Sequence, residues 1–494
     1  MRLEDLLGRV PGLRRDAGEI PPAPEVRGLT ADSRAVRPGF LFAALPGARM
    51  DGRAFIAQAV ERGAAAVLAP EGTAWAAGTP RLPLLTAEDP RRALALLAAA
   101  FHAPQPDTVV AVTGTNGKTS TVDFLRQLWS LAGRRAASLG TLGLRAEGFP
   151  PAPSLTTPDP VALHATLAEL ARGGIGHVAL EASSHGLEQR RLDGLRLAAA
   201  GFSNLTRDHL DYHGSMEAYA AAKLRLFDTL LESGAAAVVN ADMAPEMVAA
   251  LRGIAARRGL ELHTVGLKGE AIRLLNHLPR PDGQVLEIEV FGRKAEITLA
   301  LPGRFQADNV LLAAGLAIAT GLPAAAVLQD LPRLTGVRGR MELAARLPNG
   351  AAVYVDYAHT PDALERLLTA LRPHTAGRLH VVFGAGGDRD PGKRPLMGEI
   401  AARLADHAIL TDDNPRTEDP AAIRAAVRAG MGGAAASQEI GDRAAAIAAG
   451  LAALGAGDVL VVAGKGHEPG QTIGTVTHPF DDAETVRRLA GAVA

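Results

Sequence analysis

The sequence predicts an α/β protein of several domains, built around a parallel sheet that carries a phosphate-binding loop. The chain has 494 residues, more than a single hydrophobic core accommodates, so two to four domains are expected. Through the middle of the chain, apolar runs typical of strands alternate with stretches typical of helices, which indicates a parallel sheet covered on both faces. A glycine turn with a Gly-Lys-Thr sequence follows one of these strands and opens a helix at residues 114–119.

The composition excludes several functional classes. The formal net charge is −1, so nothing favours nucleic acid or an anionic membrane as the main partner. The chain has no cysteine, which excludes disulfides, a Cys-ligated metal and a thiol nucleophile. The first residues include acids and no apolar core, and the longest apolar run, near 93–101, is about half the length of a membrane span. We therefore expect a cytoplasmic protein with no membrane insertion.

Residues 1–104 are expected to form a small α/β domain. A strand is expected at 39–45, a helix at 55–62 and a buried strand at 64–69. The sequence Asp32-Ser33-Arg34 follows another strand, and taken alone it is equally consistent with a polar turn. A proline-rich linker at 102–107 separates this domain from the next.

The central domain is expected to span 105–335. The strands expected there are 108–113, 136–140, 177–182, 198–203, 235–240 and 262–266, and the helices are 118–132, 160–172, 215–231 and 244–258. Segments 286–290 and 295–301 alternate like an antiparallel pair. Ligands of parallel sheets bind beyond the carboxyl ends of the strands, so the functional motifs are expected there.

The turn at 114–120 is expected to bind ATP phosphates. Backbone N–H groups of the turn and of the helix N-terminus are free to bind anionic oxygens. Lys118 is expected to reach the terminal phosphates, and the Thr119 hydroxyl to ligate magnesium. The usual first glycine of such loops is replaced by Val112, so an ordinary turn with a surface lysine is the alternative. The expected ATP-binding residues of this loop are Gly114, Thr115, Asn116, Gly117, Lys118, Thr119 and Ser120.

Three further segments carry polar residues at strand ends. Glu181 ends the apolar strand 177–182, a position suited to holding Mg²⁺ beside a phosphate loop. The segment 204–214 holds two His and two Asp within six residues, which favours a functional loop over simple helix capping. Thr156 and Thr157 precede a helix, and simple helix capping is one explanation of them.

Residues 336–494 are expected to form a second α/β domain. Glycine-rich or polar loops follow its strands at 384–390, 411–416 and 464–468. Loops at the ends of parallel strands meet at one edge of the sheet, so these three are expected to form one pocket. Glycine-rich loops also occur for purely structural reasons, which is the alternative.

The segment 113–119, Thr-Gly-Thr-Asn-Gly-Lys-Thr, resembles the ATP loop of the Mur ligases and of the related folylpolyglutamate synthetases. The order of Asp32-Ser33-Arg34, Phe42 and Asp51-Gly52 resembles the uridine-nucleotide domain of the tripeptide-forming Mur ligases. The resemblance implies three domains: an N-terminal UDP-substrate domain (1–104), a central ATP domain of P-loop type (105–335) and a C-terminal Rossmann-like domain that binds the amino acid (336–494).

The resemblance also implies roles for individual residues. The UDP-substrate contacts are Ser33, Thr156, Thr157, Ser183, Gln189 and Arg191, and the ATP contacts outside the loop are Asn309, Arg340 and Asp356. The amino-acid site comprises Arg389, Asp413, Asn414, Pro415, Arg416, Gly464 and Glu468. The magnesium ligands are Thr119, Glu181, His209 and Lys223, the last as a carbamate (N6-carboxylysine), and Lys118, Lys223 and His209 are the catalytic residues. Gln306 stands where the family usually has Asn.

The implied activity is an ATP- and Mg²⁺-dependent ligation in peptidoglycan precursor synthesis. A UDP-N-acetylmuramoyl dipeptide would be activated as an acyl phosphate and joined to a diamino acid. Arg416 favours meso-diaminopimelate, since a guanidinium clamps a second carboxylate, with L-lysine and L-ornithine as alternatives. A folylpolyglutamate-synthetase-like ligase and a nucleotide-gated switch or motor are the rival classes. A monomer is expected.

Overall fold

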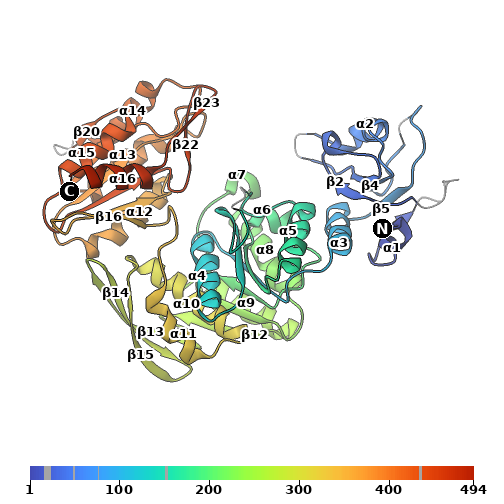
Figure 1. The fold of residues 1–494 in the computed structure, drawn as a ribbon, viewed down its shortest axis with the longest axis horizontal. Helices are drawn as coiled ribbons and strands as arrows, with labels where there is room; N and C mark the ends of the chain where they lie inside the picture. The colour runs from blue at the N-terminus through green and yellow to red at the C-terminus, as the bar shows by residue number, and fades with distance from the viewer. Residues whose placement is uncertain (16–23, 48–49, 76, 151–153, 433–436, 494) are drawn as a thin grey trace. The chain divides into compact units, whose positions relative to one another are not determined.

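The structure is a computed structural model, and it describes residues 1–15, 24–47, 50–75, 77–150, 154–432 and 437–493 (Figure 1). The described residues cluster in two compact units, which we treat separately. The first unit comprises residues 1–118, 125–263 and 316–322, and the second comprises residues 119–124, 264–315 and 323–494. The expected domain boundaries, 1–104, 105–335 and 336–494, remain a prediction.

The first unit begins with a five-stranded sheet. Its strand order is β1-β5-β4-β3-β2, formed by Arg14–Arg15, Leu84–Ala87, Ala66–Pro70, Phe40–Ala43 and Gly28–Thr30. All neighbours are parallel except β1 and β5. Helices α1 (Leu3–Leu7) and α3 (Pro90–His102) pack on one face, and α2 (Ile56–Glu61) packs on the other. The strand expected at 64–69 and the helix expected at 55–62 are confirmed, whereas β5 and α3 were not predicted.

The larger sheet of the first unit has a parallel centre. Its parallel strands are β6 (Thr108–Thr113), β7 (Ala136–Gly140), β9 (His177–Glu181), β10 (Ala199–Phe202) and β11 (Ala236–Asn240), followed by β12 (Glu261–Gly266). The order is β11-β10-β6-β9-β7, with β8 (Gly143–Ala146) antiparallel at the edge. The strands predicted for this region are thus confirmed. Strand β6 lies in the middle, so the loop that follows it has strand ends on both sides.

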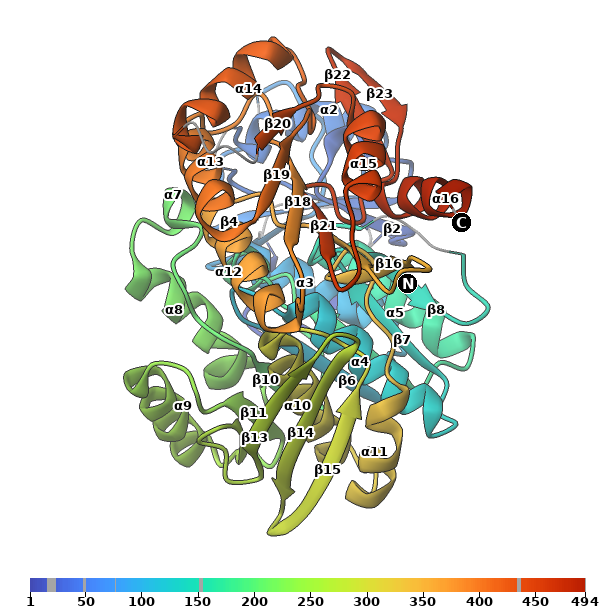
Figure 2. The ribbon, with the colours of Figure 1, turned by 90° about the vertical axis from the view of Figure 1, so that its left-hand side faces the viewer.

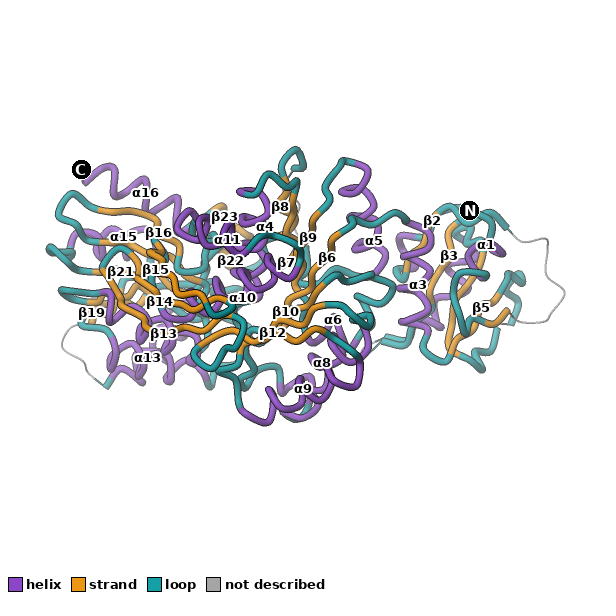
Figure 3. Tube along the Cα trace, turned by 90° about the horizontal axis from the view of Figure 1, so that it is seen from below, coloured by secondary structure: helices purple, strands orange, loops and turns teal. Residues whose placement is uncertain are grey.

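Helices cover both faces of this sheet, as predicted. Side chains of α5 (Pro160–Arg172) and α9 (Pro245–Arg258) form one buried cluster with the strands. Helix α4 (Lys118–Leu131) lies on the other side of the strands from α8 (Met216–Arg225) and α9 (Figure 3). The helix expected at 215–231 is interrupted, because a π-helical segment at Leu226–Leu230 follows α8. The short helices α6 (Ser184–Glu188) and α7 (Leu210–His213) were not predicted.

The second unit contains a three-stranded antiparallel segment and a C-terminal sheet. Strands β13 (Ile272–Arg280), β14 (Gly283–Val290) and β15 (Arg293–Leu299) are antiparallel neighbours, and they are followed by α10 (Arg304–Ala319) and α11 (Ala324–Asp330). The β14–β15 pair confirms the antiparallel pair predicted from the sequence.

The C-terminal sheet is parallel except at one edge. Its order is β16-β17-β21-β18-β19-β20, formed by Glu342–Arg346, Ala352–Asp356, Val459–Ala463, Leu379–Phe383, His407–Leu410 and Ser437–Glu439. One face is covered by α12 (Pro361–Leu371), α13 (Lys393–Leu404) and α14 (Pro420–Arg428), and the other by α15 (Arg443–Ala452) and α16 (Asp482–Val493) (Figure 2). A hairpin, β22 (Gly470–Ile473) and β23 (Val476–Pro479), stands apart from the sheet. No helix in the described ranges is both long and apolar enough to span a membrane.

Candidate functional site

The loop between β6 and α4 is locked in place by the end of the neighbouring strand β10. The Thr115 N–H donates to the Asn204 carbonyl (2.8 Å), and the Asn116 N–H donates to Asn204 Oδ1 (2.9 Å). Gly114 has a φ of +146°, and a Cβ there would collide with Ser203 Oγ. Only glycine therefore fits this position. The loop backbone is held rigidly before any ligand arrives, and α4 begins directly after it, which is the geometry of an anion site.

Two lysine side chains converge on the carbonyl of Gly114. Lys118 Nζ donates to the carbonyl oxygens of Gly114 and Thr115, at 2.9 Å each. Lys223 Nζ, from α8, donates to the same Gly114 carbonyl at 2.7 Å. The amino groups of two lysines therefore meet at one carbonyl of this loop.

The environment of Lys223 is unusual for an ammonium. Its side chain is 1% exposed, and its Nζ lies 4.6 Å from the centroid of the Tyr219 ring. Burial lowers the pKa of Lys223 well below its usual value, nearby Lys118 lowers it further, and Asp208 opposes both. No carboxylate among the described residues forms an ion pair with Lys223 within 4 Å. A buried cation without a carboxylate partner is costly, which favours the neutral amine.

Glu181 is positioned at the carboxyl end of β9 by the turn after β7. Its carboxylate accepts hydrogen bonds from the Thr141 N–H (2.8 Å) and the Thr141 hydroxyl (3.2 Å), and the residue is 2% exposed. The Thr141 hydroxyl also lies 3.0 Å from that of Thr156, and the Thr157 hydroxyl donates to the Glu181 carbonyl at 2.8 Å. The threonine pair thus lies beside the predicted metal ligand, and helix α5 is capped instead by Asp159, whose carboxylate accepts from the N–H groups of Val161 and Ala162.

The expected UDP-substrate residues of the central sheet form one hydrogen-bonded chain. The Ser183 hydroxyl donates to Thr157 Oγ1 (3.0 Å), and Arg191 donates to the Thr157 carbonyl (2.6 Å) and to Gln189 Oε1 (2.7 Å). Burial lowers the pKa of the Arg191 guanidinium, yet the group stays charged.

A cleft of about 1060 Å³ opens within the first unit. It is lined by Ser33, Gln189 and Arg191, which the structure thereby brings together from segments far apart in the sequence. The Ser33 hydroxyl donates to Gln58 Oε1 at 2.8 Å. Arg27 and Arg91 also line the cleft, and the sequence analysis missed them, because neither belongs to a motif. Thr156, Thr157 and Ser183 are not among the residues that line it.

His209 lies in the segment 204–214, at a φ of +52°. Its ring is about half exposed and packs edge-on against His185, with centroids 4.9 Å apart. In the described part of the chain, no three His, Asp or Glu side chains are grouped closely enough to hold a metal ion. Magnesium usually binds through one or two protein carboxylates, with substrate phosphates and waters as its other ligands. The single carboxylate of Glu181, next to the loop expected to bind phosphates, is therefore consistent with a magnesium site.

In the second unit, Asp356 ends β17 and orders the segment before β16. Its carboxylate accepts hydrogen bonds from the N–H groups of Met341 (2.7 Å) and Ala358 (2.9 Å), and burial raises its pKa. The Arg340 guanidinium stacks on the Tyr357 ring at 4.7 Å. The roles of Asn309, Arg340 and Asp356 in binding ATP stay predictions.

Gln306 and Asn309 of α10 are buried and contact each other. The Asn309 amide donates to Gln306 Oε1 (3.3 Å), and the Gln306 amide donates to the Arg340 carbonyl (3.1 Å). The longer glutamine side chain thus reaches the segment that carries Arg340.

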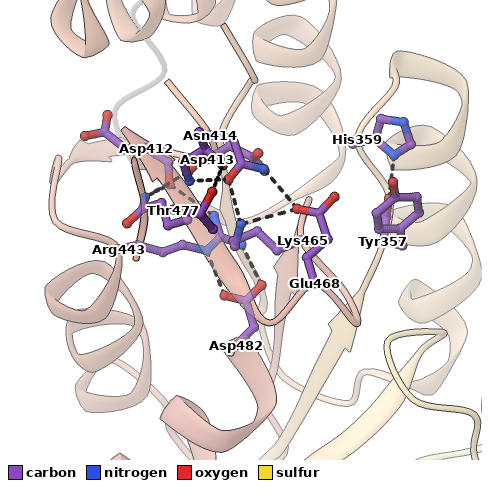
Figure 4. A network of polar contacts seen from close by, with 12 residues as sticks. Tyr357, His359, Asp412, Asp413, Asn414, Arg443, Lys465, Glu468, Thr477 and Asp482 are labelled. Carbon is purple, nitrogen blue, oxygen red and sulfur yellow. Dashed lines mark hydrogen bonds and ion pairs between the residues drawn. The ribbon is translucent and has the colours of Figure 1, made fainter. Parts of the chain in front are cut away.

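The predicted amino-acid residues gather at the carboxyl ends of β18, β19 and β21. Arg416, at a φ of +53°, donates to the Gly387 carbonyl at 2.6 Å. A Cβ placed on Gly386 would lie 3.0 Å from Arg416 Nη1 and 3.9 Å from Arg389 Cγ, so the two arginines flank this glycine. Asn414 donates to Glu468 Oε2 at 2.9 Å (Figure 4). The side chains of Arg389, Arg416 and Glu468 therefore lie at the same end of the sheet.

Comparison with known families decides what this architecture is. The chain matches three family models: the Mur ligase family catalytic domain over residues 25–102, the Mur ligase middle domain over 112–317, and the Mur ligase glutamate ligase domain over 339–466. A protein of Caulobacter vibrioides is 56% identical over 480 residues, which cover 95% of this chain and 97% of the relative. The chain belongs to the Mur ligase family.

Other relatives of this Mur ligase agree. A protein of Agrobacterium fabrum is 52% identical over 488 residues, covering 99% of this chain and 98% of the relative. Both curated relatives are named UDP-N-acetylmuramoyl-L-alanyl-D-glutamate--2,6-diaminopimelate ligase. A solved structure with the same name has a TM-score of 0.71 at 36% identity and covers 95% of each chain. A Mycobacterium tuberculosis folylpolyglutamate synthase, at 20% identity and a TM-score of 0.61, shares the fold.

These findings confirm three of the predictions made from the sequence: the family, the three-domain α/β fold class and the assignment as a ligase.

Lys465 is the clearest residue that the sequence analysis missed. It lies in the loop expected at 464–468 but received no role there, although its side chain is fully buried beside Asn414 and Glu468. A lysine just past a strand of five apolar residues, Val459–Ala463, and separated from it only by Gly464, was the available signal.

Proposed function

We propose that this Mur ligase joins meso-diaminopimelate to UDP-N-acetylmuramoyl-L-alanyl-D-glutamate with hydrolysis of ATP, in cytoplasmic peptidoglycan precursor synthesis. The names of relatives that are 56% and 52% identical over nearly the whole chain support this substrate pair. The observation that carries the choice of amino acid is the pairing of Arg389 and Arg416 around Gly386, beside Glu468.

The reaction proceeds in two steps. An oxygen of the D-glutamyl carboxylate attacks the γ-phosphorus of ATP, ADP leaves, and an acyl phosphate forms. The amine of the amino acid then attacks the acyl carbon, the tetrahedral intermediate expels phosphate, and the amine loses its proton. Lys118 and the N–H groups at the start of α4 stabilise the negative charge that develops on the transferred phosphoryl oxygens, since the Thr115 and Asn116 N–H groups already donate to Asn204.

The chain offers ligands for Mg²⁺ around the same loop. The Thr119 hydroxyl, Glu181, His209 and a carbamate on Lys223 would hold it. Bound magnesium supplies positive charge that screens the phosphates and the reacting carboxylate. A carbamate forms on a neutral amine, the form of Lys223 that burial favours, and it places an anion next to the positive charge of magnesium.

The UDP part of the substrate fits the cleft of the first unit. The cleft holds a nucleotide-sized volume, and Arg27, Arg91 and Arg191 among its lining residues offer charge for a diphosphate. Ser33 and Gln189 add polar contacts.

The amino-acid site is built for a substrate with a second α-amino-acid group. Arg416 and Arg389 offer two guanidinium groups for carboxylates, and Glu468 with the Gly464 carbonyl accepts an ammonium. L-lysine lacks the distal carboxylate, so it leaves a guanidinium without its partner, a loss of a few kcal/mol.

We expect Arg416→Ala to lose the preference for meso-diaminopimelate. Its kcat/KM for meso-diaminopimelate falls about 10- to 100-fold, because one charge-assisted carboxylate contact is removed. Phosphate release with the UDP-dipeptide and each of meso-diaminopimelate, L-lysine and L-ornithine measures this. The matched control is Arg403→Ala, which removes an exposed arginine of α13 that is paired with Glu365 of α12, and it leaves all three values unchanged. A wild-type enzyme that prefers L-lysine or L-ornithine contradicts the assignment.

A further inference from the structure

Lys465 is a fully buried lysine behind the amino-acid site. It lies one residue beyond Gly464, which follows β21, and its side chain is 0% exposed. Its Nζ donates to Asn414 Oδ1 (3.0 Å) and to Glu468 Oε2 (3.3 Å). An ammonium with no exposed surface does not touch a substrate, so any effect of Lys465 on the reaction acts through the two side chains that it contacts.

The first effect is on Asn414. Its Oδ1 accepts hydrogen bonds from two donors, Lys465 Nζ and the Thr472 N–H (2.9 Å). Two donors on one side fix the amide orientation, because an amide nitrogen cannot accept from either of them. Asn414 Nδ2 therefore points to Glu468, and with Oδ1 occupied by two donors the side chain can only donate further hydrogen bonds.

The second effect is on Glu468. Its Oε2 accepts from both Lys465 and Asn414, whereas no described residue donates a hydrogen bond to Oε1. The Glu468 side chain is 32% exposed, unlike the lysine behind it. The carboxylate is thus held by one oxygen and presents the other as an acceptor.

The backbone under this group of side chains is itself fixed. The fully buried Arg443 donates to the Ala463 carbonyl (3.0 Å) and the Asp412 carbonyl (3.3 Å), and it forms an ion pair with the equally buried Asp482 at 2.7 Å. Gly464, at a φ of +121°, could not carry a Cβ without colliding with Asp413 Oδ2. The strand ends that carry Lys465 and Asn414 are therefore joined before a ligand binds.

We propose that Lys465 is a positioning residue that sets the polarity of the amino-acid site, with Asn414 as donor and Glu468 as acceptor. This inference rests on the proposed function of the site. A donor on one side and an anionic acceptor on the other match the carboxylate and the ammonium of an α-amino-acid group in one orientation only. Without the Lys465 ammonium, the Asn414 amide is free to flip and Glu468 loses the cation that holds its Oε2.

The test is Lys465→Met, which keeps the length and removes the charge and the donors. We expect KM for meso-diaminopimelate to rise about 10- to 100-fold, the range for loss of charged hydrogen bonds. The kcat at saturating amino acid and KM for ATP and the UDP-dipeptide stay within about twofold, because Lys465 contacts none of the reacting groups. Lys294→Met, an exposed lysine on β15, is the matched control and leaves every value unchanged.

A double-mutant cycle with Glu468→Gln separates positioning from general destabilisation. Because Lys465 acts through Glu468 as well as Asn414, Lys465→Met raises KM for meso-diaminopimelate by a smaller factor in the Glu468→Gln background than in the wild type. The inference is overturned if the KM of the double variant rises by the product of the two single effects, or if Lys465→Met leaves KM unchanged. If Lys465→Met does not fold by circular dichroism, the cycle is made with Lys465→Gln, which keeps one neutral donor. A wild-type enzyme that does not use meso-diaminopimelate refutes the proposed function instead, so the two failures are distinguishable.

Discussion

Lys118→Ala is expected to lower the rate of ligation by about 10²- to 10³-fold while leaving the fold intact, since one preorganised charge contact to the transferred phosphoryl group is lost. In the structure, Lys118 Nζ donates hydrogen bonds to the carbonyl oxygens of Gly114 and Thr115, which belong to the same loop. The loop itself is held by Asn204 and shaped by Gly114, so alanine at 118 does not remove these constraints.

Phosphate release with both substrates present measures the rate, and circular dichroism measures the fold. Lys294→Ala, which removes an exposed lysine remote in sequence from the loop, serves as the matched control. Near-normal turnover of Lys118→Ala with an unchanged spectrum would refute the assignment of this loop to phosphate binding.

Lys223→Ala is expected to be inactive and to regain part of its activity with short carboxylic acids such as formate or acetate. The physical reason is that Lys223 as a carbamate supplies a carboxylate near magnesium, and a small free carboxylate can occupy the space left by alanine. The lysine is buried, and its described contacts are the Gly114 carbonyl and the Tyr219 ring, neither of which is anionic.

Rescue is measured as phosphate release over a concentration series of the added acid. Lys118→Ala is the matched comparison, because its missing group is a cation and a carboxylic acid should not restore it. Incorporation of isotopically labelled bicarbonate into the wild-type protein, absent in Lys223→Ala, tests the modification independently. A high-resolution map of the ATP–Mg²⁺ complex with a bare ammonium at Lys223 would contradict it.

The regular elements and the loops at strand ends were predictable because they follow from local periodicity. Strand β6, the glycine turn and α4 need only apolar runs, glycines and a helix start, all of which lie within about twenty residues of sequence. The sequence analysis did not predict β5, β8 and α6. Each has only four or five residues, too few to show a clear hydrophobic period.

The parts of the site that depend on contacts far apart in sequence were not predictable. Arg27 and Arg91 line the same cleft as Ser33 only because β2 and α3 fold to it. The orientation of Asn414 depends on Lys465, which is 51 residues away, and on Thr472, which is 58 residues away. Gln306, which stands where the family usually has Asn, donates to the Arg340 carbonyl, a contact across 34 residues. Such contacts are set by tertiary packing and leave no local pattern.

The most direct test of the account is the dependence of ADP and phosphate formation on the two acceptor substrates. Purified protein is incubated with ATP and Mg²⁺, with UDP-N-acetylmuramoyl-L-alanyl-D-glutamate, meso-diaminopimelate, both or neither, and the products are identified by mass spectrometry. A ligase that works through an acyl phosphate forms one ADP, one phosphate and one UDP-tripeptide per turnover, and only when both substrates are present. Steady phosphate release without either substrate, or no UDP-tripeptide with both, would contradict the account.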